Sequence, residues 1–435
     1  MRSVGTFRRV IGALLAGVIA TTTAASVASG TSYEVWLIDQ SNTRPDGGGT
    51  LYIYPGASVE GKSGASAAAE VIDLGGAARD LCLAQTGTSP VRPHMLEFDM
   101  DHRYGVLAFV GTGHVLFIDA ATRAPVRCID VGVQAHAAFP TPDGDAVLVA
   151  NQNGKLLQRI ATDFSTGTFT LDAGATLDLV NGLTPSGAPR EAAGIRPDNA
   201  PICPVIDSSS RFAFVTLRGG GLFVVDIRAT PMRIVAEYDR TTVAPNGCGG
   251  VETGGRMYIT SGGGTAANPY SAALYSFDLG AFSTNPAPPN QPAPETVFRV
   301  SPPTPADAHG SVLTKHGRYL WVADRATNEM TVVETASNDV VGGFGFAGGV
   351  SSDPAADLLD VSPAGNRVFA ALRGPNPLTG NAPAVGNAVG ATPGLGVFRV
   401  TAGGGRGVLQ AVVPVTHVVN GVETADPHAI KVRRN

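Results

Sequence analysis

The stretch DPHAIKVRR, residues 426–434, begins like the first strand of a repeat and stops where the chain stops. The stretch YEVWLIDQSN, residues 33–42, instead matches a second strand, RYLWVADRATN at residues 318–328, and TLYIYPG at residues 50–56 supplies a third strand. The two ends of the chain therefore complete one four-stranded unit between them. A unit split in this way joins the last repeat of a ring to the first and leaves no sheet edge open there.

Between these ends, one hairpin pattern recurs: a polar residue, a short apolar stretch, a turn, and an Arg or Asp that leads a strongly β-type strand. The copies cover residues 94–110, 136–150, 203–217, 248–260, 309–323 and 357–372. A third strand and a more variable fourth strand follow each hairpin. Four short strands repeated every 40 to 60 residues or so are typical of propeller blades. The sequence therefore predicts an all-β, seven-bladed β-propeller, closed by N- and C-terminal strands in one blade.

Residues 1–28 have the pattern of a signal peptide. Arg8 and Arg9 precede an apolar run at residues 10–20, and small residues precede the expected cleavage site after Ala28. The run is too short to span a bilayer. We expect a mature single domain at residues 29–435 that is periplasmic or secreted and has no membrane span; the export route stays open.

The composition of the chain argues against a nucleic-acid partner. Charged residues make up 15% of the chain, and its net charge is −5. The one basic block is the short Arg433-Arg434 pair near the C-terminus. Nucleic-acid binding requires a basic surface that this composition does not predict.

The repeats resemble the YVTN-type bacterial propeller repeats, in which a phrase of the form Pro-Asp-Gly, four residues, Val-Ala-Asn recurs. The segment from Pro142-Asp143-Gly144 to Asn151 is nearly that phrase. The resemblance covers essentially the whole mature chain. It implies a fold rather than an activity.

Histidines occupy one column of the repeat. With the Arg or Asp that opens the second strand as the anchor, His94, His136 and His309 each lie nine positions before it. His428 begins the last first strand in a similar Asp-x-His context. Because first strands line the axis of a propeller, we expect these four side chains to converge at one mouth of the central channel.

The other blades carry ligand-type residues near the same column. Cys203 and Cys248 each lie eight positions before their anchors, and the sixth blade offers Asp357 and Asp360 in a less regular register. Imidazole and thiolate together suit copper, zinc or iron. We therefore predict a transition-metal site, with copper favoured, that contains His94, His136, His309, His428 and, in one of two alternatives, Cys203 and Cys248.

Two structural alternatives stay open. The histidines could make structural hydrogen bonds that the repeat inherited by duplication. Cys203 and Cys248 could form a disulfide between adjacent blades rather than ligate an ion. For Cys82 and Cys128, which we place on outermost strands of neighbouring blades, a disulfide is the expectation in an oxidising compartment.

The predicted ring is similar to the histidine-lined axial sites of two propeller families, the selenium-binding/methanethiol oxidase family and nitrous oxide reductase. The similarity is one of architecture and does not extend to their motifs. It implies a metal-binding protein, with a copper-dependent oxidoreductase as the specific form.

The alternatives to that function are a non-enzymatic YVTN-type scaffold for a ligand or protein and a lactonase-like hydrolase. In each case, we expect a small molecule or peptide to bind at the channel mouth. Further polar residues at nearby turns could bind an anionic substrate there or pair with one another: Asp39, Arg218, Asp324, Arg325 and Arg373.

Overall fold

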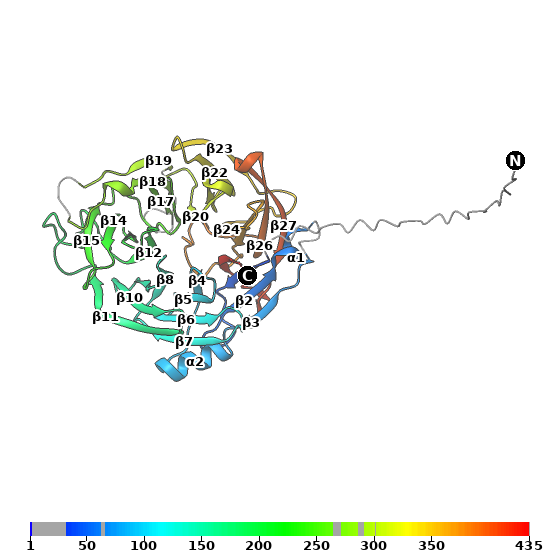
Figure 1. Cartoon of the computed structure of the whole chain (residues 1–435), viewed down its shortest axis with the longest axis horizontal. Helices are drawn as coiled ribbons and strands as arrows, with labels where there is room; N and C mark the ends of the chain where they lie inside the picture. Colours follow the sequence, from blue (N-terminus) through cyan, green and yellow to red (C-terminus); the bar gives the residue numbers. More distant parts are fainter. Residues whose placement is uncertain (2–31, 62–65, 264–270, 286–290, 301, 435) are drawn as a thin grey trace. The chain divides into compact units, whose positions relative to one another are not determined.

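The computed structural model describes residues 1, 32–61, 66–263, 271–285, 291–300 and 302–434. The fold belongs to the compact unit Thr31–Asn435. The predicted signal peptide, residues 1–28, lies outside the described residues except for Met1. Within the described part of the chain, seven four-stranded antiparallel sheets stand in a ring as the blades of a β-propeller (Figure 1). The predicted fold class is confirmed.

Six blades are built from consecutive strands, which run in chain order from the axis outward. Blade one contains β4 (Pro93–Phe98), β5 (Tyr104–Phe109), β6 (His114–Asp119) and β7 (Pro125–Asp130). Blade two contains β8 (Ala135–Pro140), β9 (Ala146–Asn151), β10 (Leu156–Asp163) and β11 (Thr168–Asp178). Blade three contains β12 (Pro201–Ile206), β13 (Phe212–Leu217), β14 (Leu222–Asp226) and β15 (Arg233–Tyr238).

The next three blades follow the same order. Blade four contains β16 (Gly250–Thr253), β17 (Arg256–Gly262), β18 (Ala272–Asp278) and β19 (Glu295–Val300). Blade five contains β20 (Ala308–Leu313), β21 (Tyr319–Asp324), β22 (Glu329–Glu334) and β23 (Asp339–Gly345). Blade six contains β24 (Ala356–Val361), β25 (Arg367–Leu372), β26 (Gly394–Thr401) and β27 (Arg406–Pro414).

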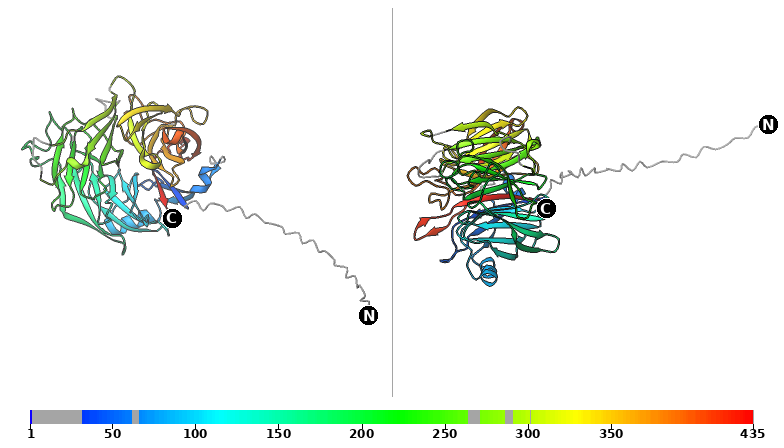
Figure 2. Two further views of the ribbon diagram at one scale, coloured as in Figure 1. Left: turned by 45° about the horizontal axis from the view of Figure 1, so that its top comes forward. Right: turned by 90° about the vertical axis from the view of Figure 1, so that its left-hand side faces the viewer.

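Blade seven joins the two ends of the chain, as the sequence predicts. The C-terminal strand β30 (Pro427–Arg434) is innermost, and β1 (Tyr33–Asp39), β2 (Thr50–Pro55) and β3 (Glu70–Asp73) follow it outward. β1 pairs with β30 along its whole length, from Tyr33 opposite Arg434 to Asp39 opposite Pro427. Figure 2 shows β30, in red, beside the blue first strand. The ring is therefore closed by hydrogen bonds between residues far apart in the sequence.

The apolar core lies between the blades. Middle strands are sandwiched between neighbouring sheets, so both of their faces are buried, and β13 (FAFVTL) is buried at every position. Outer strands contact solvent, and most of β23 (DVVGGFG) is exposed. The gradient explains why second and third strands are continuous apolar runs while fourth strands vary.

Cys82 and Cys128 form the predicted disulfide, with an S–S distance of 2.03 Å. The predicted strand around Cys82 is wrong, because this residue lies in helix α2 (Ala77–Thr86), which packs against β7. The segment AARDLCLAQT is rich in good helix formers, and Gly87 ends the helix in the left-handed conformation at φ 82°. The bridge therefore fastens a connecting helix to the outer strand of blade one.

The remaining elements are short. They are helix α1 (Gly56–Glu60), the 3-10 turns η2 (Leu279–Ala281), η3 (Lys315–Gly317) and η4 (Ala402–Gly404), and a hairpin of β28 (Val418–Val419) and β29 (Val422–Glu423). None of the helices in the described part of the chain is both long and apolar enough to cross a membrane.

Candidate metal centre at the propeller axis

The ligand-type residues lie near the starts of the innermost strands, where the pairing register with the neighbouring strand is irregular. In blade one, the pairing register of β4 with β5 shifts around His94, and in blade two that of β8 with β9 shifts around His136. The registers around His309, Asp357 and His428 shift in the same way. A β-bulge re-aims the side chain that it leaves unpaired. The bulges therefore explain how residues at strand ends come to face one another across the axis.

The structure brings the four predicted histidines together. The rings of His94 and His428 stack with their centroids 3.7 Å apart. The ring centroids of His94 and His136 are 4.6 Å apart, and those of His309 and His428 are 5.7 Å apart. Each blade places one ligand-type residue at this level, in blade order His94, His136, Cys203, Cys248, His309, Asp357 and His428.

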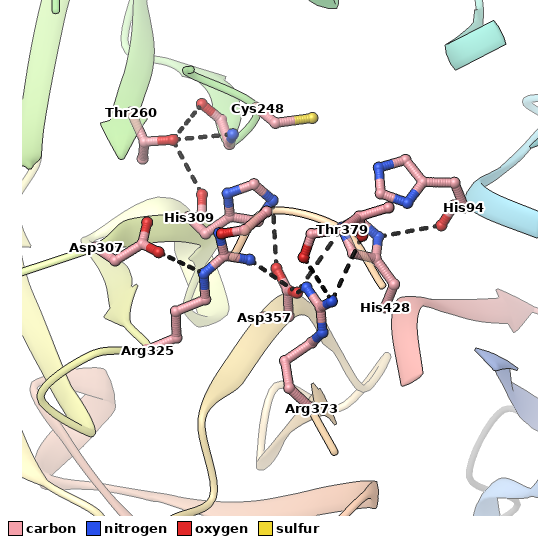
Figure 3. A network of polar contacts seen from close by, with 12 residues as sticks. His94, Cys248, Thr260, Asp307, His309, Arg325, Asp357, Arg373, Thr379 and His428 are labelled. Atoms are coloured by element: carbon pink, nitrogen blue, oxygen red, sulfur yellow. Dashed lines mark hydrogen bonds and ion pairs between the residues drawn. The ribbon is translucent and has the colours of Figure 1, made fainter. Parts of the chain in front are cut away.

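Ligand atoms gather in two groups among the described residues: His136 with the bonded pair Cys203 and Cys248, and His309 and His428 with Asp357 (Figure 3). His309 Nε2 lies 3.2 Å from Asp357 Oδ1, and His428 Nε2 lies 3.8 Å from Asp357 Oδ2. Within each group, one ligand atom of each residue lies within 4.8 Å of the others. Although His309 Nε2 and Asp357 Oδ1 are close, their geometry is not that of a hydrogen bond, and neither buried atom has a hydrogen-bond partner among the described residues.

Hydrogen bonds fix which ring nitrogen carries the proton in His94 and His428. Gln40 Nε2 donates to the Asp426 carboxylate, so Gln40 Oε1 is the atom that accepts from His94 Nδ1, at 2.8 Å. His428 Nδ1 donates to the backbone oxygen of His94 at 3.2 Å. In the neutral rings, both Nε2 atoms therefore carry a lone pair. Metal-ligating histidines are typically held through their other nitrogen in this way.

A chain of buried ion pairs lies behind Asp357. Asp357 Oδ2 accepts from Arg325 Nη1 at 3.0 Å and from Arg373 Nη1 at 2.5 Å. Arg325 Nε also donates to Asp307 at 2.7 Å, and Arg373 Nε donates to Asp426 at 2.6 Å. All five side chains are at most 2% exposed. Two guanidinium groups against three carboxylates leave one net negative charge in the protein interior.

The donors around Asp357 and Asp307 hold these two groups of the chain as carboxylates. Burial opposes ionisation of Asp357, but Arg325 and other nearby cationic groups outweigh it and hold its pKa well below its usual range. Burial raises the pKa of Asp307, yet its oxygens accept only from donors, namely Arg325, Asn387 and the backbone N–H of Gly263. Donors of this kind stabilise the charged form of a carboxyl group.

The histidines do not supply the missing positive charge. Burial lowers the pKa of His309 to about 3 and that of His136 to about 4. Burial also lowers the pKa of His94 and of His428 well below the usual value. All four rings are therefore neutral at pH 7, and neutral imidazole is the form that binds metal ions.

Cys203 and Cys248 form a disulfide, with Cα atoms 5.1 Å apart. Of the two alternatives that the sequence leaves open, the structure shows the bridge. The bonded sulfurs are not thiolates, so in this state the two cysteines do not offer the soft donors that the predicted metal site includes. The bridge joins blades three and four at the axis, and Cys203 Sγ lies 4.0 Å from His136 Nδ1.

Comparisons with known proteins support the fold. No protein-family model and no curated protein matches the sequence. Solved structures do match: a periplasmic gluconolactonase of Pseudomonas aeruginosa has a TM-score of 0.56 at 14% identity, covering 93% of this chain and 99% of that one. A candidate 6-phosphogluconolactonase of Bacteroides uniformis has a TM-score of 0.57 at 12% identity, covering 93% and 100%. A Lactobacillus plantarum protein has a TM-score of 0.55 at 12% identity, covering 92% and 99%.

At these identities, the likeness shows the fold alone. This chain has a propeller fold whose structural neighbours include lactonase-type proteins. The propeller's own site must therefore be judged from its residues.

Asp357 is the site residue that the predicted column does not include. The turn of blade six closes with a bond from Ser362 N to Arg367 O, whereas in blade five the acceptor is Tyr319, the residue after the anchor arginine. Asn366 rather than Arg367 is therefore the equivalent anchor. Asp357 lies nine positions before Asn366, as the histidines do before their anchors.

A cavity of about 280 Å³ opens beside the cluster, and both His136 and His309 line it. The loop at residues 374–393, between β25 and β26, lines the same cavity through Leu378, Thr379 and Gly380. Its backbone oxygens at Thr379 and Gly380 accept hydrogen bonds from Arg373 and Arg325. Of the polar residues expected at the mouth, these two arginines therefore pair with buried acids, and both Arg218 and Arg325 line the cavity.

We expect the stability of the metal-free propeller to fall as the pH drops from 7 to 5. The unfolded chain takes up protons on histidine near pH 6.5, whereas folded His309 and His136, with pKa values of about 3 and about 4, stay neutral. Because the unfolded state binds more protons in this window, each ring should contribute a loss of about 2 kcal/mol at pH 5.

Urea unfolding of chelator-treated protein at several pH values measures this loss. In a His136→Gln variant, the free energy of unfolding should fall less steeply as the pH drops, because one histidine no longer contributes to the loss. A stability that is flat between pH 7 and pH 5 would show that the rings are already solvated or protonated.

Proposed function

We propose that this chain is an exported metal-binding propeller whose axial ion is ligated by His309 Nε2, Asp357 and His428 Nε2. Tetrahedral ligands about 2.0 Å from an ion lie about 3.3 Å apart. The distances of 3.2 Å from His309 Nε2 to Asp357 Oδ1 and 3.8 Å from His428 Nε2 to Asp357 Oδ2 are of this order. Small side-chain movements would therefore suffice to enclose an ion.

The observation that supports this proposal most strongly is that two buried atoms have no hydrogen-bond partner among the described residues. His309 Nε2 and Asp357 Oδ1 face each other without a hydrogen bond, although a buried polar atom that lacks a partner costs about 1–3 kcal/mol. The ion-pair chain behind them has one negative charge too many. A divalent cation between the two atoms would satisfy both groups and offset that charge.

His94 and His136 extend the donor set toward the cavity. Their Nε2 atoms lie 3.2 Å apart, and because His94 carries its proton on Nδ1, His94 Nε2 accepts this hydrogen bond from His136 Nε2 in the metal-free protein. The proposal that all four histidines share one ion remains a prediction, because the group with Asp357 contains two of them. His94 also orients His428 by accepting its Nδ1 proton.

The donor set bears on which metal binds. The sequence favours copper partly because it places imidazole together with thiolate. The two sulfurs are bonded to each other, so the thiolates on which that preference depends are not present. Imidazole and carboxylate suit zinc and iron as well as copper. An ion with an open position supplies Lewis-acid activation of water.

We propose a metal-dependent hydrolase of a small ester or lactone. The lactonase-type structural neighbours are consistent with this reaction, though they establish only the fold. Two disulfides fit an oxidising, exported environment, and one of these neighbours is described as periplasmic.

One observation favours the competing function, a non-enzymatic scaffold. The loops on the histidine face carry exposed apolar side chains, among them Val133 and Leu183 at 60% and 63% exposure and Val418 at 61%. Exposed apolar surface of this kind is common at protein-binding sites. A scaffold would not require an ion at the axis, so metal content separates the two functions.

Elemental analysis of protein purified without chelators tests the proposal. We expect the wild type to hold a transition metal, and His309→Ala to lose it while keeping the fold. Losing even an outer partner of a ligand typically costs roughly 10- to 100-fold in affinity, so losing a ligand should cost at least as much.

His417→Ala is the matched control, because His417 lies on the same face but outside the ring and bonds only within its own loop. This variant should keep the metal. A wild type without metal above background, or a His309→Ala variant that retains it, would favour the scaffold.

A further inference from the structure

The cavity beside the metal centre is lined by two sets of equivalent positions. One set is the residue two places before the ligand-type residue of a blade, and the other is the residue that follows the second strand. Around the cavity, these positions carry the arginines and amides Arg92, Gln134, Asn246, Gln152, Arg218 and Arg325, together with Val110 and Gly263.

The charge of the cavity is opposite to that of the chain. The described lining residues include three arginines and no Asp or Glu, whereas the whole chain has a net charge of −5. The three arginines come from blades one, three and five, so they surround the cavity rather than lie along one wall. A concave site lined by one sign of charge concentrates ligands of the other sign.

The arginines differ in how far their charge is already used. The guanidinium group of Arg325 already donates to Asp307, to Asp357 and to the backbone oxygen of Gly380. Arg218 bonds Asp198 through Nε and Asn153 through Nη1, which leaves Nη2 free among the residues that the structure describes.

Arg92 is the least engaged of the three. Its side chain forms no hydrogen bond or ion pair with any residue in the described ranges, although it is partly buried. Its backbone has φ 57°, the left-handed region that a residue other than glycine adopts at a cost. Strained positions of this kind concentrate at ligand sites.

We propose that the cavity binds a small anionic molecule whose carboxylate or phosphate group is held by Arg92 and Arg218. This inference names the substrate class of the proposed hydrolase and in that respect rests on the proposed function. Planar guanidinium groups match both oxyanions through paired hydrogen bonds. The remainder of the molecule lies against His136 and His309, which line the same cavity.

The cavity sets the size of the ligand. Its volume of about 280 Å³ corresponds to about nine water molecules at the volume each occupies in the liquid. A short organic acid or a small phosphate ester fits this space, whereas a folded peptide does not. The amide side chains of Gln134, Gln152 and Asn246 offer neutral donors and acceptors to the rest of such a molecule.

Calorimetric titration at low ionic strength tests the proposal with three probes: malonate, its neutral isostere malonamide, and inorganic phosphate. We expect the anions to bind and malonamide not to bind. Arg92→Gln should weaken anion binding by roughly tenfold to a hundredfold, the usual effect of losing one charged hydrogen-bond donor. Arg127→Gln is the matched control, because Arg127 lies exposed on β7 far from the axis in its blade, and it should change nothing.

The source of the anion follows from the same titrations. Tighter binding of malonate would identify an organic acid, and tighter binding of phosphate would identify a phosphate ester. Equal binding of malonate and malonamide, or an Arg92→Gln variant with wild-type affinity, would overturn the proposal.

Titrating metal-free and zinc-loaded protein separates this proposal from the metal centre. Anion binding that depends on Arg92 in a protein that takes up no zinc would refute the metal centre and leave the anion site standing. Binding that requires zinc and ignores Arg92→Gln would mean that the ion holds the anion directly, and this would refute the anion site.

Discussion

A chain that ends at residue 425 is expected not to fold cooperatively. The truncation removes β30, the innermost strand of blade seven, which pairs with all of β1 and also contacts β4 and β24 in the neighbouring blades. Residues Pro427 to Ile430 are fully buried, so the loss of apolar contacts is large. The cost is comparable to the whole free energy of unfolding of a typical domain, about 5–15 kcal/mol.

Circular dichroism and urea unfolding measure this effect. We expect the truncated chain to show no sigmoidal transition or to aggregate, because β1 becomes an unpaired edge beside an open channel. Truncation by residues 434 and 435 alone is the control. It leaves nearly all of the pairing between β1 and β30 and should cost less than about 1 kcal/mol. A chain ending at residue 425 that melts like the full-length protein would show that the ring does not depend on its closing strand.

The closure of the ring is predictable from sequence because duplication preserves the hairpin pattern even where the chain is cut. Comparing residues 33–42 with residues 318–328 is enough to assign the first as a second strand without a first. The structure confirms this assignment, since β1 and β21 hold the same place in their blades. The strand prediction is wrong at Cys82, because no repeat covers this segment and a local helix preference competes with a strand pattern.

The candidate site is predictable only in part. The column of histidines identifies the axis, and the structure brings all four rings together there. Asp357 falls out of register in the sequence comparison because the anchor of its turn is Asn366 and not the more conspicuous Arg367. The two arginines that neutralise Asp357 hold equivalent positions after the second strands of blades five and six. The repeat pattern aligns Arg325 with Arg373, but it does not show that both contact one carboxylate.

One signal in the sequence could have revealed the charge chain. Asp307 and Asp426 each lie two positions before a histidine of the column, at His309 and His428. In blade one the same position holds Arg92, and in blade two it holds Gln134. At this repeat position, blades five and seven carry acids that pair with arginines, whereas blades one and two carry an arginine and an amide. The mouth therefore has one side on which the charges are paired and another on which they are not.

Asp357→Asn is expected to abolish metal binding without destabilising the metal-free protein. In the wild type, the buried chain contains three carboxylates and two guanidiniums, and Asp357 Oδ1 faces His309 Nε2 without a hydrogen bond. The substitution brings the charges to balance at two against two. The asparagine oxygen can still accept from Arg325 and Arg373, while its amide N–H group can donate toward His309.

This expectation separates a metal ligand from an ordinary structural ion pair. If Asp357 served only to pair with the two arginines, its loss would cost about 3–5 kcal/mol, the usual result of breaking a buried pair. If the site is built for a cation, the metal-free wild type is the strained state. Asp357→Asn should then unfold at a urea concentration equal to or above that of the chelator-treated wild type.

Asp426→Asn is the matched control, because it makes the same chemical change in the same chain without touching a ligand. Asp426 accepts from Arg373, from Gln40 Nε2 and from the backbone N–H of Leu378. An asparagine in its place would point its own N–H group at one of these donors, and the two could not form a hydrogen bond. We expect this variant to lose several kcal/mol and to keep its metal. If both variants lose stability equally and neither changes the metal content, the cluster at the axis is a structural ion-pair network and the metal centre is refuted.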